Sequence, residues 1–154
     1  MENERSIHDV MLRRATENDL PSLERLFASG SVLSAGDQRR VDDMLVAEVA
    51  ETLVGCIGLH ALGGDGLLRA ACVATEWRER DVGRLLVESA LTAGALKALD
   101  AVYLFTAGSE RFFARFGFLV IHGDDVPSAV RRWAEVNGDE PSGRVAMRVK
   151  LIES

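Results

Sequence analysis

The chain has 154 residues, of which 47% are hydrophobic and 27% charged, a composition typical of one globular domain and unlike that of a disordered protein. The net charge of -6 at pH 7 argues against a nucleic-acid surface, because phosphate backbones require clustered basic side chains. The N-terminus is polar and acidic and no apolar run is long enough to span a bilayer, so we expect a cytoplasmic protein without a membrane segment. Two cysteines, Cys56 and Cys72, are too few for a four-cysteine zinc site, and we expect no metal and two core thiols.

The N-terminal half predicts a strand, a helix and three further strands. Residues 10–15 have strand character, and the apolar residues of 20–28 recur at helical spacing. Residues 30–36 break this pattern with small and polar side chains, which indicates a plain connection or, alternatively, a loop at a substrate entrance. Residues 44–50, 53–62 and 67–74 read as strands. The glycine-rich residues 63–66 predict a hairpin between the last two.

The C-terminal half alternates helices with short strands. A helix begins at Val82, a buried strand covers residues 101–105, and a compact helix over 109–116 ends at Gly117. A strand over 118–121, a helix from Pro127 and an alternating strand over 145–151 complete the chain. The order predicts a single mixed α/β (α+β) domain over residues 1–154, with a mostly antiparallel central sheet flanked by helices.

The junction at residues 70–86 is the most informative segment, because an apolar strand leads through a short loop into the helix that begins at Val82. The first turn of a helix has backbone N–H groups without partners, and the helix dipole adds positive potential there. Arg78, Arg80 and Arg84 surround this position with further positive charge. The pattern predicts a binding site for a phosphorylated cofactor.

These motifs resemble those of the GNAT family of acetyl-CoA-dependent N-acetyltransferases. Residues 78–83 lie on the family's pyrophosphate signature R/Q-x-x-G-x-G/A, and residues 106–118 are similar to its second motif, a short helix that closes with Gly-Phe. The order of elements matches a GNAT domain over nearly the whole chain. Within the family, the chain looks like the small amino-acid N-acetyltransferases, above all the group found with arsenic-resistance genes, which residues 55–59 and 125–130 resemble.

The resemblance implies acetyl-CoA as co-substrate and direct attack by the amine of a small amino-acid-like acceptor. In this family the pantetheine arm pairs with the strand before the loop, and a backbone N–H of that strand polarises the thioester carbonyl. The implied cofactor-binding residues are Cys72, Val73, Ala74, Arg78, Glu79, Arg80, Asp81, Val82, Gly83, Arg84 and Phe113. Glu110 and Thr106 are candidate catalytic residues, and for Glu110 a solvated position on the helix is the equal alternative.

Other positions are left with two readings. Arg69 is either a ligand for a substrate carboxylate or an exposed strand residue. His60 and His122 are expected at the surface rather than in catalysis. Many GNAT proteins pair, so the resemblance also permits a homodimer. Acetylation of a protein N-terminus or lysine is a third reading, which nothing in the sequence favours.

The sequence departs from the family pattern in the phosphate loop. Two positions that the family usually fills with glycine hold Glu79 and Asp81, and a carboxylate near a pyrophosphate costs about 1–3 kcal/mol at an effective dielectric near 20. Asp81 is also a favoured helix N-cap, and its side chain would then accept hydrogen bonds from the N–H groups that a pyrophosphate needs. Phe113 stands where family enzymes often carry a proton-donating Tyr. The alternative function is therefore a catalytically degenerate GNAT-fold module that binds a partner or senses a ligand.

Overall fold

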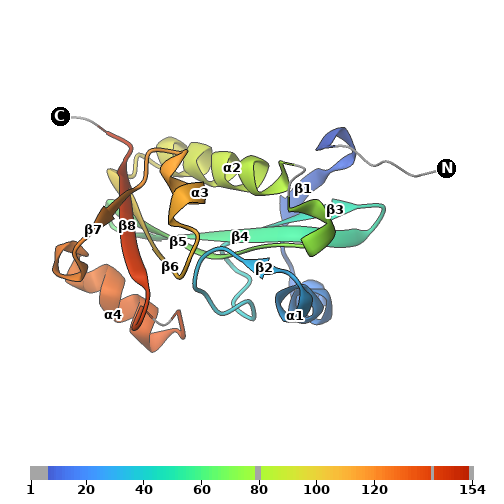
Figure 1. Ribbon diagram of the computed structural model, residues 1–154, viewed down its shortest axis with the longest axis horizontal. Helices are drawn as coiled ribbons and strands as arrows, with labels where there is room; N and C mark the ends of the chain where they lie inside the picture. The colour runs from blue at the N-terminus through green and yellow to red at the C-terminus, as the bar shows by residue number, and fades with distance from the viewer. Residues whose placement is uncertain (1–6, 79–80, 140, 153–154) are drawn as a thin grey trace.

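The computed structural model describes residues 7–78, 81–139 and 141–152. Its elements in chain order are β1 (Met11–Arg14), α1 (Leu20–Ser29), β2 (Ser31–Val32), β3 (Met44–Val49), β4 (Thr52–Leu62), β5 (Asp65–Val73), α2 (Val82–Leu96), β6 (Ala101–Thr106), α3 (Glu110–Ala114), β7 (Leu119–Ile121), α4 (Ser128–Val136) and β8 (Val145–Lys150). The strands form one sheet in the order β1-β3-β4-β5-β6-β8-β7, with β2 paired to β5 beside this path. Helix α2 covers one face of the sheet, whereas α1 and α4 lie on the other (Figure 1).

The predicted mixed α/β fold is confirmed. Within the described residues, every strand pair except β5 with β6 is antiparallel. The expected helices and strands are present, with ends that differ by one or two residues. The hairpin between β4 and β5 turns at Gly63, whose φ of 64° lies in the left-handed region that glycine adopts without strain.

Residues 30–36 differ from the prediction, because they contain the short strand β2. A strand of two residues has no period that a sequence pattern can reveal. Its strand character comes from its partner, since Ser31 pairs with Val73 and Val32 with Cys72 on β5. The expected connection is therefore a part of the sheet.

Strands β5 and β6 form the one parallel pair, and they stay together only briefly. Their register covers residues 65–67 on β5 and 101–103 on β6. Further along β5, the partner on this side is β2 at Cys72 and Val73. The two strands thus separate toward the end of β5 that leads to α2, and the segment that contains β2 enters the space between them.

The core lies on both faces of the sheet. On one face, Leu86 and Ala90 of α2 pack with Ile57 and Leu59 of β4. On the other face, α1 packs against β4 and β5 and α4 packs against β6; the buried residues there include Leu23, Leu26, Cys56, Cys72, Phe105 and Val130. The sheet therefore lies between two helical layers. The packing of α2 on the sheet sets the orientation of the N-terminus of this helix.

Both cysteines are free and buried, as the sequence predicts. They lie directly opposite one another on β4 and β5. Burial raises the pKa of the Cys72 thiol to about 12 and that of the Cys56 thiol well above its ordinary value. Because the thiolate is the reactive form, we expect the native protein to resist iodoacetamide at mildly alkaline pH. Both thiols should react in denaturant, as mass spectrometry will show; rapid labelling of the native protein would contradict this burial.

Candidate functional site

A groove of about 290 Å³ lies where the end of β5 meets α2 and α3. Strand β2 forms one wall, the N-terminal turn of α2 the floor, and α3 the opposite wall. The lining residues are Ser31, Leu33, Val73, Arg78, Gly83, Gly108, Ser109, Arg111, Phe112 and Arg115. The groove thus joins the two segments that the sequence singled out, residues 70–86 and 106–118.

The floor of the groove is the uncapped start of α2. Asp81 occupies the N-cap position with a φ of 68° and a ψ of 11°, and its side chain makes no capping hydrogen bond. The alternative in which the Asp81 carboxylate occupies the first-turn N–H groups is therefore contradicted by the structure. An N-cap side chain reaches those groups from an extended backbone, whereas Asp81 is left-handed, a conformation that Asp tolerates better than most residues.

The Asp81 carboxylate pairs instead with Arg84, at 3.5 Å between Oδ2 and Nη2. This contact raises the pKa of the Arg84 guanidinium above its ordinary value. Arg84 also lies 3.3 Å from the Glu88 carboxylate, so it runs along the exposed side of α2 and does not line the groove. Two carboxylates on the exposed side of α2 therefore partner this arginine, and it is not among the residues that line the groove.

Three other arginines supply the positive charge of the groove. Arg78 follows the 3-10 helix Thr75–Trp77 in the β5–α2 connection; Arg111 belongs to α3 and Arg115 is its C-cap. None of them forms an ion pair with another residue in the described ranges. Glu79 and Arg80, which the sequence also placed in this site, lie outside the described residues. The sequence analysis missed Arg111 and Arg115, although their spacing of four along a helix was a usable signal.

Residues 31–35 cover the edge of β5 that faces the gap. The Leu33 N–H donates to the Ala71 carbonyl at 2.7 Å, and the Ala71 N–H donates to Ser34 Oγ at 3.1 Å. With Ser31 and Val32 already paired to β5, this edge has intrachain partners as far as Val73. A pantetheine arm can pair here, as the family resemblance implies, only after residues 31–34 leave the edge.

The same segment also reaches β6, so that it bridges the two separating strands. Ala35 accepts a hydrogen bond from the Ala70 N–H and donates its own N–H to the Phe105 carbonyl, both at 2.9 Å. The Thr106 hydroxyl donates to the Leu33 carbonyl at 2.7 Å. Residues 31–35 therefore fill the wedge between β5 and β6 with backbone contacts on both sides.

The second motif divides its residues between core and groove. Thr106 is fully buried, and its hydroxyl also accepts from the Ser109 N–H, so both of its hydrogen-bonding functions have partners. Glu110 begins α3, is half-buried and does not line the groove. Phe113 lies in the core, packed edge to face on Phe118 at 5.7 Å between ring centroids.

Phe112, the neighbour of Phe113, is the aromatic residue that lines the groove. A Cβ on Gly83 would lie 3.0 Å from Cζ of the Phe112 ring. The absence of a side chain at Gly83 therefore lets α3 approach the first turn of α2. This close approach defines the width of the groove and explains the need for glycine at this position.

Arg69 has neither of the two roles that the sequence predicts for it. It is fully buried, with Nε 2.7 Å from Asp139 Oδ2 and Nη1 2.9 Å from Asp43 Oδ1. Its remaining donors bind the carbonyl groups of Asp37 and Arg40. Both readings from the sequence are therefore wrong, since Arg69 is not exposed and its donors are used by carboxylates and carbonyls of its own chain.

The two histidines have separate surroundings. His60 is half-buried; its Nδ1 lies 3.0 Å from Asp43 Oδ2, and its ring stacks on Trp133 at 3.9 Å between centroids. His122 is exposed, and its Nδ1 accepts the Asp124 N–H. Neither lines the groove.

The fold and the groove define the class of this protein. The sequence of residues 40–120, which includes β5, the start of α2 and α3, matches the family model described as an acetyltransferase (GNAT) domain. This match covers more than half of the chain, and the protein belongs to that family.

Known relatives agree with this assignment at the level of the fold. An amino-acid acetyltransferase of Vibrio atlanticus (strain LGP32) is 25% identical over 92 residues; the match covers 58% of this chain but only 21% of that longer protein. A Mycobacterium tuberculosis protein solved with CoA and a second ligand superposes with a TM-score of 0.72 and 24% identity, over 92% of this chain and 99% of the other. The N-acetylglutamate synthase of Neisseria gonorrhoeae, complexed with coenzyme A and N-acetyl-glutamate, has a TM-score of 0.76 and 17% identity, over 94% and 35%.

The part of the chain that the structure describes has neither a metal-binding cluster nor a membrane-spanning helix. No group of three or more His, Cys, Asp or Glu side chains there is placed to hold a metal ion. No helix there is long and apolar enough to cross a bilayer.

Proposed function

We propose that the protein is an N-acetyltransferase that moves the acetyl group of acetyl-CoA to the amine of a small amino-acid-like acceptor by direct attack. The observation that carries this proposal is the N-terminus of α2, which has no side-chain cap from Asp81 and opens on a groove with three arginines that form no ion pair among the described residues. Such an arrangement binds a pyrophosphate through backbone N–H groups and bidentate guanidinium contacts. The CoA present in the related structures supports the same cofactor here.

The residues of the groove divide the binding work. The N–H groups of Val82 and Gly83, with Arg78, Arg111 and Arg115, would hold the pyrophosphate. Acetyl-CoA supplies the acetyl group as a thioester, which an amine can attack without an acyl-enzyme. Glu110 stays our candidate for the base that takes the proton of the amine, directly or through water. The Thr106 hydroxyl anchors residues 31–35, so we assign it a positioning role.

The acceptor pocket is proposed beside residues 33–43, where two connections meet. The Asp37 N–H donates to Asp139 Oδ1 at 2.9 Å, which ties this loop to the α4–β8 connection. The names of the related amino-acid acetyltransferase and N-acetylglutamate synthase support an amino acid as acceptor. The resemblance to the arsenic-resistance group, the homodimer and the cytoplasmic location stay predictions.

A second candidate function rests on residues 31–35. Because they occupy the β5 edge that pantetheine uses in this family, a protein in which they never leave would be a GNAT-fold binding module without transferase activity. The two functions can be distinguished by measurement, because the binding module would not bind acetyl-CoA in a way that leads to acetyl transfer.

The test is a calorimetric titration with acetyl-CoA of the natural protein and of two Asp81 variants. We expect micromolar binding by the natural protein. Asp81→Asn and Asp81→Gly both remove the carboxylate near the first turn of α2, and each should tighten binding by about threefold to tenfold. Asn tolerates the left-handed backbone as Asp does, so it separates the effect of charge from that of backbone freedom.

Transfer is then measured as CoA release with single amino acids as acceptors. Turnover with an amino acid supports the enzyme. Two results would overturn the proposal in favour of the binding module. One is acetyl-CoA binding without turnover of any amino acid tested. The other is the absence of acetyl-CoA binding by the natural protein and by both Asp81 variants when all three are folded.

A further inference from the structure

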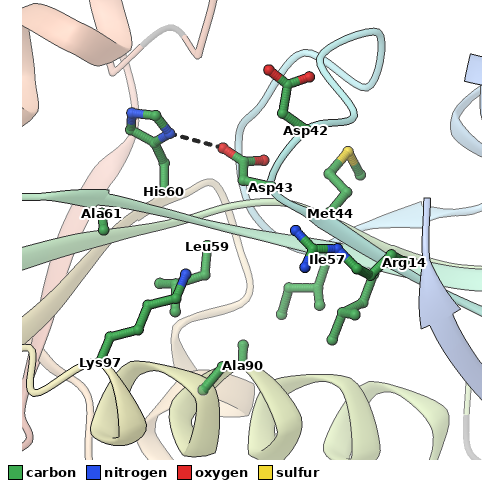
Figure 2. Close-up of a pocket in the computed structure, with 12 residues that line it drawn as sticks. Arg14, Asp42, Asp43, Met44, Ile57, Leu59, His60, Ala61, Ala90 and Lys97 are labelled. Atoms are coloured by element: carbon green, nitrogen blue, oxygen red, sulfur yellow. Dashed lines mark hydrogen bonds and ion pairs between the residues drawn. The ribbon is translucent and has the colours of Figure 1, made fainter. Parts of the chain in front are cut away.

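A second pocket, of about 330 Å³, lies between the sheet and the C-terminal half of α2 (Figure 2). It shares no lining residue with the groove at the other end of this helix. The register of β3 with β4 begins at Met44 opposite Gly58, so the next residues of β4 lie at a notch in the sheet. Helix α2 presents only Ala90 and Ala93 to this notch, which leaves the space between helix and sheet unfilled.

The floor of the pocket is apolar. Ile57 and Leu59 of β4 point toward α2 and are almost completely buried (Figure 2). Leu45 of β3 pairs with Ile57 and also lines the pocket. Protein interiors are close-packed, and an apolar space of this size binds an apolar group more readily than it binds water. The floor therefore favours an aliphatic or aromatic body.

Two cations stand at the mouth of the pocket. Arg14 extends from the end of β1 and Lys97 from the end of α2, and both side chains line the pocket; the Lys97 ammonium lies between the sheet and the helix (Figure 2). Neither side chain forms an ion pair with a residue in the ranges that the structure describes. Lys97 is also the C-cap of α2, where its charge offsets the negative end of the helix dipole.

The acidic groups nearby do not neutralise these cations. Asp43 is held by Arg69 at 2.9 Å and by His60 at 3.0 Å, above the strand and away from the pocket floor. Asp42 points away from the pocket (Figure 2). The pocket between β4 and α2 therefore has an apolar floor and a positively charged mouth.

We propose that this pocket binds a small carboxylate with an apolar body. The floor holds the apolar body, the Arg14 guanidinium donates two hydrogen bonds to the carboxylate, and the Lys97 ammonium adds a second positive charge. The site is independent of the proposed acetyl transfer.

The test is a calorimetric titration of the full chain with octanoate, with octanamide as the uncharged probe of the same shape. We expect octanoate to bind at least tenfold more tightly than octanamide, and to bind equally well with acetyl-CoA present. Arg14→Gln should weaken octanoate binding about tenfold, because it removes the bidentate charge. Arg25→Gln, an exposed change on α1, is the matched control and should have no effect.

Filling the pocket provides a second and independent measurement. Ala93→Leu places a larger apolar side chain in the space, and it should abolish octanoate binding while circular dichroism shows an unchanged fold. Equal binding of octanoate and octanamide, octanoate binding that Arg14→Gln leaves intact, or loss of octanoate binding on addition of acetyl-CoA would each overturn the proposal. So would the absence of octanoate binding by the natural protein.

Discussion

Replacement of Arg69 by methionine is expected to lower the free energy of unfolding by about 3–5 kcal/mol. The guanidinium is fully buried between Asp139 and Asp43, and its other donors bind two carbonyl groups. Removing it leaves the Asp139 carboxylate, only 1% exposed, without its cation. An uncompensated buried charge is among the most destabilising changes available to a folded protein. Urea denaturation of the natural protein and the variant, followed by circular dichroism, measures the difference.

A matched change separates burial from charge. Arg39→Met also removes an arginine that pairs with an aspartate, but the Arg39 side chain is 79% exposed, so its ion pair with Asp37 is screened by water. We expect this control to change stability far less than Arg69→Met. Comparable losses from the two variants would show that the buried network does not carry the stability assigned to it. Partial recovery in the double variant Arg69→Met/Asp139→Asn would support it, because the orphaned charge is removed.

The largest expected effect on binding comes from the groove at the start of α2. The double variant Arg78→Gln/Arg111→Gln should bind acetyl-CoA at least about 100-fold more weakly, because each charge-assisted hydrogen bond to a phosphate contributes about 1.5–3 kcal/mol. The remaining affinity should depend less on salt, since fewer ion pairs form on binding. Calorimetric titration with acetyl-CoA at low and moderate salt measures both quantities.

The control for this experiment is an arginine outside the groove. Arg25→Gln removes the same charge from the exposed side of α1 and should leave acetyl-CoA affinity unchanged. A double variant that binds as tightly as the natural protein would place the cofactor elsewhere. That result would also remove the observation on which the proposed transferase function rests.

The sequence by itself determined most of the local structure. Alternation at residues 145–151, the helical stripe after Val82 and the glycines near Gly63 act over a few residues, and the structure has β8, α2 and a hairpin at these places. The proposed anion-binding position at the start of α2 also follows from local sequence, because a strand, a loop with arginines and a helix start are contiguous. Arg111 and Arg115 joined it only when α3 folded against Gly83.

The tertiary structure decided three features that the sequence does not predict. Asp81 has the local preference of an N-cap, but the path from β5 into α2 places it in the left-handed region and turns its carboxylate to Arg84. Arg69 found partners 26 and 70 residues away, a distance across which no periodic pattern carries information. Residues 31–32 form strand β2 because β6 separates from β5 there, which leaves the edge of β5 free to pair with them. Local sequence patterns indicate the secondary structure that a segment prefers. The partners of charged side chains and of strand edges are instead the groups that the folded chain brings near them.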